Sequence, residues 1–189
     1  MELPPFPCVP VHLDEATHSS GVIDVFLKER PSPRWVLLGA HAVQTNAQLW
    51  TAWIKTTRNE LRGTSLARSI DAEFMRYLAG THHVSEAFAR AGYQEGSEDA
   101  WILYLPQAES SRNSLGHLHP FLPEHVAIPE DLSDLMNQLK WNSRESLMIP
   151  SIEGSKMLGA DVDSVGLDGL EERLIAHISM ADDQSASHR

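Results

Sequence analysis

The sequence predicts a single α+β domain, and three observations support this. A long capped helix begins at Thr45, a corner of two short helices spans Ser69–Gly92, and a run typical of a strand spans Ala100–Leu105. The 189 residues fit one domain, and a hydrophobic share of 42% is enough to bury a core. We expect that domain over residues 20–181, a loosely ordered arm over 1–19 and a disordered tail over 182–189.

The first forty residues predict strands. Residues 1–19 hold four prolines, which suit a loosely attached arm with a short strand near Val9–Leu13. Gly21–Leu27 is rich in β-branched and aromatic residues and predicts a strand. Arg34–Leu38 is a short apolar run that predicts a buried strand.

The helix that begins at Thr45 carries two different faces. Thr45 and Gln48 have the spacing of a capping box, and Gly63 ends the helix. One arc holds Trp50, Trp53, Ile54, Thr57 and Leu61, and an adjoining arc holds Lys55, Arg58 and Arg62. The tryptophan spacing favours core packing over base stacking. The basic row is either a solvated helix face or a contact for phosphates.

The corner over Ser69–Gly92 is the most regular stretch of the chain. Its first helix has an apolar face of Ile70, Phe74, Tyr77 and Leu78, and Gly80 can adopt the left-handed conformation that ends it. Thr81 is expected to cap the second helix, and Gly92 is expected to end that helix in the same way. The side chains expected to project from the corner are Arg76, His82, His83, Glu86 and Arg90.

The remaining elements follow from shorter patterns. The composition of Gln107–Pro129 predicts a loop, and Pro129 is expected to start a helix. Leu147–Ile152 suggests a short strand. The last helix, Asp168–Ala181, has an apolar stripe of Leu170, Leu174, Ile175 and Ile178. This stripe either belongs to the core or docks on a partner protein.

Charge is distributed unevenly along the chain. The net charge of −11 argues against broad, non-specific binding of nucleic acid. Residues 55–90 nevertheless hold six Lys/Arg and four Asp/Glu, and they form the only net basic segment. This segment either binds part of an anion or reflects ordinary fluctuation of charge. No apolar run is long enough to cross a bilayer, and the lone Cys8 is consistent with a reducing cytoplasm, so we expect a cytoplasmic protein without a membrane partner.

No segment carries a recognised catalytic motif, and we expect no enzyme activity, cofactor or metal. His117, His119, Glu124 and His125 are the best metal candidates, but glycine and prolines interrupt the segment, so a surface loop is favoured. Asp161 to Glu172 matches a calcium loop only in part. Cys8 has no adjacent base and is a poor nucleophile.

The order of residues over Ser69–Gly92, Ser-x-x-x-Glu-x-x-x-Tyr-Leu-x-Gly-x-x-x-Val-x-x-Ala-x-x-x-x-Gly, resembles the small kinase-binding subunit of the KEOPS complex (the TPRKB-type family). The resemblance runs from about Trp35 to Pro106 and returns weakly in the last helix. His82 and His83 stand where that family is expected to have an Arg-Gln or similar pair. The resemblance implies a non-catalytic protein with a small, mostly antiparallel sheet packed with helices. It also implies two partners, the kinase-like ATPase subunit of the complex and the 3′ CCA end of tRNA.

The resemblance also implies site residues. The tRNA site maps to the basic segment and the corner, namely Lys55, Arg58, Arg62, Arg68, Arg76, Thr81, His82, His83, Val84 and Arg90. The kinase contact maps to the last helix, through Leu170, Leu174, Ile175 and Ile178. The complex as a whole installs threonylcarbamoyl on an adenosine of tRNA. Two alternatives stay open: a stand-alone metal-dependent enzyme that uses the histidine-rich loop, and a protein-binding adaptor that does not contact RNA.

Overall fold

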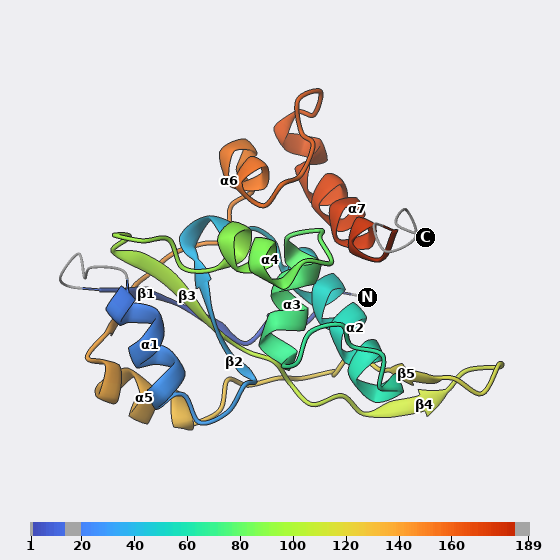
Figure 1. The fold of residues 1–189 in the computed structure, drawn as a ribbon, viewed down its shortest axis with the longest axis horizontal. Coiled ribbons are helices and arrows are strands. Elements are labelled where there is room, and N and C mark those ends of the chain that lie inside the picture. Colours follow the sequence, from blue (N-terminus) through green and yellow to red (C-terminus); the bar gives the residue numbers. More distant parts are fainter. Residues whose placement is uncertain (1, 14–19, 184–189) are drawn as a thin grey trace.

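A four-stranded antiparallel sheet with the strand order β2–β3–β1–β6 organises the molecule (Figure 1). The computed structural model describes residues 2–13 and 20–183. The strands are β1 (Cys8–His12), β2 (Trp35–Gly39), β3 (Asp99–Tyr104) and the short β6 (Asn142–Ser143). This arrangement confirms the predicted α+β domain with a small antiparallel sheet.

Alternate residues of β2 and β3 point into two separate cores. Val36 and Leu38 pack on one face of the sheet, whereas Trp35 and Leu37 pack on the other. A strand turns successive side chains to opposite faces, so a strand that is covered on both faces is apolar throughout. Every residue of β2 is accordingly buried, as the apolar run at 34–38 predicts.

The larger core lies between the sheet and the helices α2 (Asn46–Arg62), α3 (Ile70–Leu78), α4 (Val84–Ala91) and α7 (Leu170–Asp183). Trp50 and Trp53 are buried here, and their rings meet edge to face with centroids 5.2 Å apart. The tryptophans therefore belong to the core, as their spacing predicts, and they are not a surface on which bases stack.

The other face is covered by α1 (Ser20–Glu29) and α5 (Asp131–Leu139), which contact each other. The prediction of a strand over Gly21–Leu27 is wrong, because this segment lies within α1. Val22 and Phe26 are one helical turn apart and both are buried against the sheet, so tertiary packing decides the structure against β propensity. Ile23 and Leu27 remain exposed.

The strand expected near Val9–Leu13 is present as β1, but it is an inner strand of the sheet. It pairs with β3 on one side and with β6 on the other, and Val11 is fully buried. This placement differs from the loosely attached arm that the prolines suggest, because Pro10 lies in the sheet and its carbonyl oxygen accepts from the backbone N–H of Arg144. Residues 14–19 and 184–189 lie outside the described residues, whereas Asp182 and Asp183 belong to α7.

Two further segments differ from prediction. The expected loop at 107–129 contains a hairpin of β4 (Ser110–Arg112) and β5 (Leu118–Pro120), which extends away from the rest of the molecule in Figure 1. The short strand expected over Leu147–Ile152 is absent from the structure as described, and α6 (Ile152–Met157) begins at its end instead. Single turns of 3-10 helix, Ala40–Ala42 and Leu167–Gly169, complete the fold.

The capping box of α2 is confirmed. The Thr45 hydroxyl accepts from the backbone N–H of Gln48 at 3.1 Å, and the Gln48 side chain accepts from the backbone N–H of Thr45. We therefore expect Thr45→Ala to lower the free energy of unfolding by about 1 kcal/mol in denaturant titration. Thr51→Ala is the control, because the Thr51 hydroxyl bonds to the Ala47 carbonyl oxygen within the helix and caps nothing. Equal losses in the two variants would contradict the role of the cap.

The corner between α3 and α4 has the predicted shape with two corrections. Gly80 has a φ of +58°, and a Cβ atom there would lie 2.4 Å from the ring of His177 in α7, so only glycine fits. The N-cap residue of α4 is His83 rather than Thr81. Gly92 ends α4 in an extended conformation (φ −69°, ψ 173°) and not in the left-handed one.

Candidate functional site

Arg76, expected to project towards RNA, lies inside the molecule with no exposed surface. Its guanidinium donates to the carboxylate of Glu73 from Nε at 3.2 Å and from Nη2 at 2.9 Å. Its Nη1 donates to the carbonyl oxygens of Thr81 and Ala181, which ties the corner to the end of α7. Arg76 is therefore a structural residue, and the prediction that it binds RNA directly is wrong.

Glu73 is the acceptor around which this interior network is built. Its carboxylate also accepts from the Asn59 amide at 2.9 Å and from the backbone N–H of Ala67 at 2.9 Å. Burial by itself would raise the pKa of Glu73, but these hydrogen bonds and the charge of Arg76 hold it below its ordinary value. The pair is thus ionised and satisfied within the fold.

A second network lies nearer the surface, around the carboxylate of Asp182 in the last turn of α7. Tyr77 donates its hydroxyl to Oδ1 at 2.7 Å, and Lys55 and Arg58 of α2 approach Oδ2 to 3.6 and 3.5 Å. Burial, followed by this hydrogen bond, raises the pKa of Tyr77 to about 12. Two of the predicted RNA-binding cations therefore already hold one anion.

The other predicted cations of residues 55–70 are Arg62, at the far end of the same helix, and Arg68, beyond that end. Arg62 donates from Nε to the carbonyl oxygen of Leu118 at 2.8 Å, which joins α2 to the β4–β5 hairpin. Arg68 is exposed in the loop between α2 and α3. Lys55, Arg58 and Arg62 thus form one row along α2, as the sequence predicts, and we call this the α2 row.

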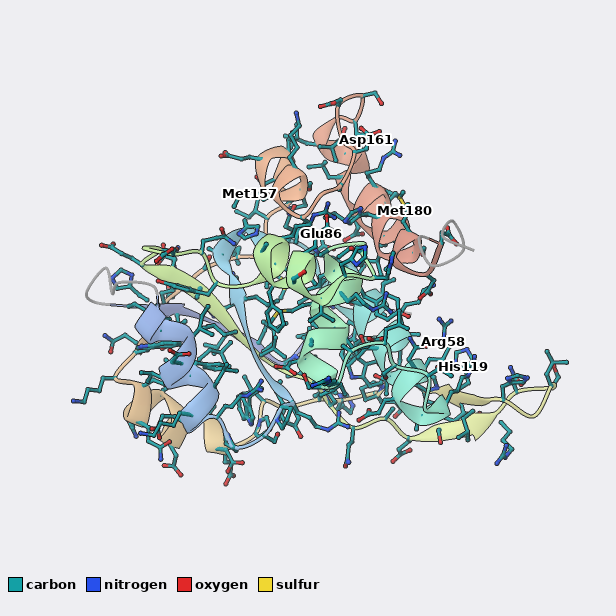
Figure 2. All side chains as sticks on the ribbon, viewed as in Figure 1. Arg58, Glu86, His119, Met157, Asp161 and Met180 are labelled. Carbon is teal, nitrogen blue, oxygen red and sulfur yellow. The ribbon has the colours of Figure 1, made fainter. Side chains whose placement is uncertain are left out.

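The corner forms a separate group. The Thr81 hydroxyl donates to the carboxylate of Glu86 at 2.5 Å, and Arg90 forms an ion pair with the same carboxylate at 2.5 Å. The hydrogen bond from Thr81 and the charge of Arg90 lower the pKa of Glu86. His82 and His83 lie with ring centroids 4.0 Å apart, His83 being exposed, and Val84 is half-buried. Figure 2 shows Glu86 on α4, well apart from Arg58 on α2.

Most of the apolar stripe of α7 is not on the surface. Leu170, Leu174 and Ile178 are at most 1% exposed and belong to the larger core with α2 and α3, while Ile175 is half-buried. A kinase subunit cannot reach these side chains while the helix stays in place. The prediction of a partner contact is therefore corrected for Leu170, Leu174 and Ile178, which belong to the core, and it stays a prediction for Ile175.

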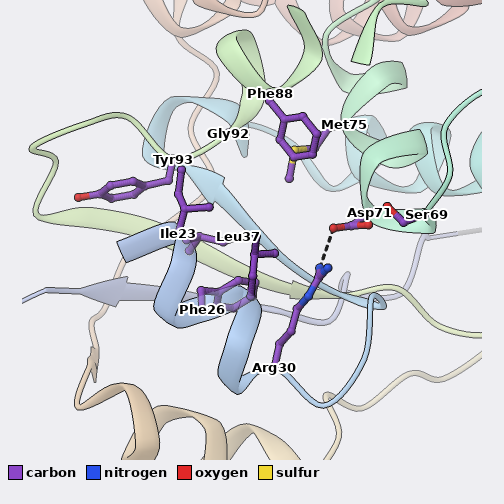
Figure 3. Close-up of a pocket in the computed structure, with 11 residues that line it drawn as sticks. Ile23, Phe26, Arg30, Leu37, Ser69, Asp71, Met75, Phe88, Gly92 and Tyr93 are labelled. Carbon is purple, nitrogen blue, oxygen red and sulfur yellow. Dashed lines mark hydrogen bonds and ion pairs between the residues drawn. The ribbon is translucent and has the colours of Figure 1, made fainter. Parts of the chain in front are cut away.

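A pocket that the sequence did not indicate lies between α1, β2 and the α3–α4 corner (Figure 3). Its volume is about 220 Å³, and its walls are mostly apolar. Phe26 and Leu37 lie on one side, and Met75 and Phe88 lie on the opposite side. The sequence could have indicated it through Ile23 and Leu27. These two residues lie together at the rim of the pocket only if residues 20–29 are predicted to be a helix.

One end of this pocket is polar. Arg30 donates from Nη1 to Oδ2 of Asp71 at 2.6 Å and to the carbonyl oxygen of Trp35 at 2.9 Å. The Asp71 side chain is only 5% exposed, and its second oxygen, Oδ1, is buried without a hydrogen-bond partner. Buried acceptors of this kind are rare in folded proteins, because leaving one unpaired costs free energy.

The remaining predictions concern metals, the thiol and membranes. Within residues 2–13 and 20–183, no three His, Cys, Asp or Glu side chains are grouped so as to hold a metal ion, and Nδ1 of His119 lies 3.2 Å from the carbonyl oxygen of Pro120. Burial raises the pKa of the Cys8 thiol to about 12, so it stays protonated at neutral pH. None of the helices described is long and apolar enough to span a membrane.

An apolar pocket with hydrogen-bonding groups at one end and a separate row of cations are two candidate contact surfaces of this protein. The family model described as "Kinase binding protein CGI-121" matches residues 15–140, and the chain belongs to this family. The match confirms the resemblance to a kinase-binding family and extends it to α1 and α5. A search of curated proteins finds no match.

Proposed function

We propose that this protein is a non-catalytic subunit of a KEOPS-like complex that modifies tRNA with threonylcarbamoyl. In this role it binds the kinase-like ATPase subunit and recruits tRNA through the 3′ CCA end. Membership of a kinase-binding family supports the first contact. The α2 row and the corner support the second.

The observation that carries the RNA proposal is the anion already held by α2. Lys55 and Arg58 both approach the carboxylate of Asp182, and this carboxylate is 39% exposed. A phosphate is also an anion, and it has more acceptor oxygens than a carboxylate. The same cations therefore suit a nucleic-acid backbone. A single-stranded end needs such a track of charge together with rings for stacking, and the exposed ring of His83 supplies one at the corner.

We expect Arg58→Glu and Arg62→Glu each to weaken binding of tRNA about tenfold, because each variant replaces a phosphate contact with a repulsive charge. Binding is measured with intact tRNA and with tRNA lacking the CCA end, at two salt concentrations, with and without the kinase-like subunit. Wild-type binding should fall when the CCA end is removed and when salt is raised. Lys28→Glu is the matched control in the measurements without the kinase-like subunit, because Lys28 is an exposed lysine in α1, on the other face of the sheet.

Unchanged binding by both reversed variants would refute the role of the α2 row. If the wild-type protein binds the kinase-like subunit but neither tRNA, even in the complex, the protein is an adaptor that does not contact RNA.

A further inference from the structure

We infer that the pocket between α1, β2 and the α3–α4 corner receives one large apolar side chain of the kinase partner, with a neutral N–H group beside it that donates to Asp71. This inference rests on the kinase-binding part of the proposed function. It assigns the partner contact to α1 and α4 and not to the stripe of α7.

The size and walls of the pocket select the apolar part of the ligand. A volume of about 220 Å³ exceeds the roughly 150 Å³ of a cavity that accommodates benzene, so one aromatic or long aliphatic side chain fits. Ile23 and Leu27 of α1 and Phe88 of α4 stand at its edge with between 42% and 47% of their surfaces exposed. A buried anchor surrounded by exposed apolar side chains is the usual centre of a protein interface.

The polar end selects the rest of the ligand. Oδ1 of Asp71 needs a donor, while Oδ2 is already occupied by Arg30. An ammonium group would bring a second positive charge next to the Arg30 guanidinium, whereas a main-chain amide or an indole N–H supplies the hydrogen bond without charge. The donor is therefore a neutral group, which we assign to an N–H.

The position of the pocket in the sequence points to the kinase subunit as the occupant. All of its lining residues lie between Ile23 and Tyr93, inside the segment that matches the kinase-binding family, whereas α7 begins at Leu170, outside that segment. Residues 14–19 and 184–189 carry no apolar side chain larger than alanine, so neither segment supplies the anchor. A second copy is disfavoured because each chain carries a net charge of −11.

The test measures the affinity of the full chain for its kinase-like subunit by calorimetry. We expect Leu27→Asp and Phe88→Asp each to weaken binding at least tenfold, because a carboxylate at the rim would have to be desolvated. Both positions are exposed, so both variants should unfold close to the wild-type temperature. Leu115→Asp is the matched control, since Leu115 is 79% exposed near the tip of the hairpin and its replacement should change the affinity less than twofold.

Asp71→Asn tests the hydrogen bond separately. The asparagine oxygen can still accept from Arg30, but its amide then presents a donor to the partner's N–H. We expect a loss of affinity of about fivefold. The variant also loses stability, because Arg30 keeps only a neutral partner, so circular dichroism at the temperature of the binding measurement checks that its helix content is unchanged. Wild-type affinity in this variant would overturn the proposed donor.

The other outcomes are also decisive. If wild-type protein binds the kinase subunit and the two rim variants bind equally well, the pocket is not the contact, although the proposed function stands. If wild-type protein does not bind the kinase subunit at all, the proposed function and the inference both fail. If light scattering finds a dimer that Leu27→Asp dissociates without changing kinase affinity, the occupant is a second copy and the inference is overturned.

Discussion

Replacing Arg76 by alanine should lower the free energy of unfolding by about 3–5 kcal/mol, because it leaves the carboxylate of Glu73 buried without its charged partner. Neither side chain of this pair is more than 1% exposed. Arg76 also donates to the carbonyl oxygens of Thr81 and Ala181, so its loss would leave acceptors unpaired at the corner and at the end of α7. The expected result is a large loss of stability, with any loss of RNA binding following from it.

Urea titration of the wild-type protein and the variant measures this difference. Arg173→Ala is the control, because Arg173 is exposed on α7 and its removal should change the free energy of unfolding by no more than about 0.5 kcal/mol. The pair should also make stability depend on pH. Since the pKa of Glu73 is lower in the folded than in the unfolded chain, its contribution is present above the ordinary glutamate range and is lost as pH falls through the folded-state pKa. A loss below 1 kcal/mol in Arg76→Ala would contradict this account.

Replacing Leu174 by alanine should cost about 2–5 kcal/mol of the free energy of unfolding, because Leu174 is only 1% exposed in the core beneath α7. Met180→Ala on the same helix is the matched control, since Met180 is 51% exposed and makes no comparable core contact. Its effect should stay within about 0.5 kcal/mol.

Thermal and denaturant unfolding of the two α7 variants distinguish a core stripe from a docking stripe. If Leu174→Ala is as stable as Met180→Ala, α7 does not pack as described. A charged residue at Leu174 is expected to unfold this region, so a loss of kinase binding in such a variant would report on folding and not on recognition.

Strong local patterns predicted their elements well. The capping box at Thr45, the left-handed Gly80 and the buried strand at 34–38 are all properties of a few neighbouring residues, and the structure contains each of them. The family could also be predicted from the sequence, because the order of residues over Ser69–Gly92 lies inside the segment that the family model matches.

Other features depend on residues far apart in the sequence. Val22 and Phe26 are spaced one helical turn apart, but the β-branched and aromatic residues of Gly21–Leu27 favour a strand, and only packing on the second side of the sheet decides for the helix. From the sequence alone, Arg76 resembles a surface cation. Only the fold surrounds it with Glu73 and with the carbonyl oxygens of Thr81 and Ala181. The pocket could be predicted only if residues 20–29 were recognised as a helix. The wrong prediction of a strand over Gly21–Leu27 therefore also concealed the candidate site.

The inner position of β1 has a consequence for how the chain folds during synthesis. Val9 pairs with Ile102, so the first strand of the sheet leaves the ribosome well before the strand that it needs. At about 5–20 residues per second the delay is several seconds, during which the apolar residues of β1 have no sheet to join. The sheet is therefore closed late by contacts of high sequence separation, which slows folding. During this interval β1 presents unpaired backbone groups that a chaperone or another chain can bind.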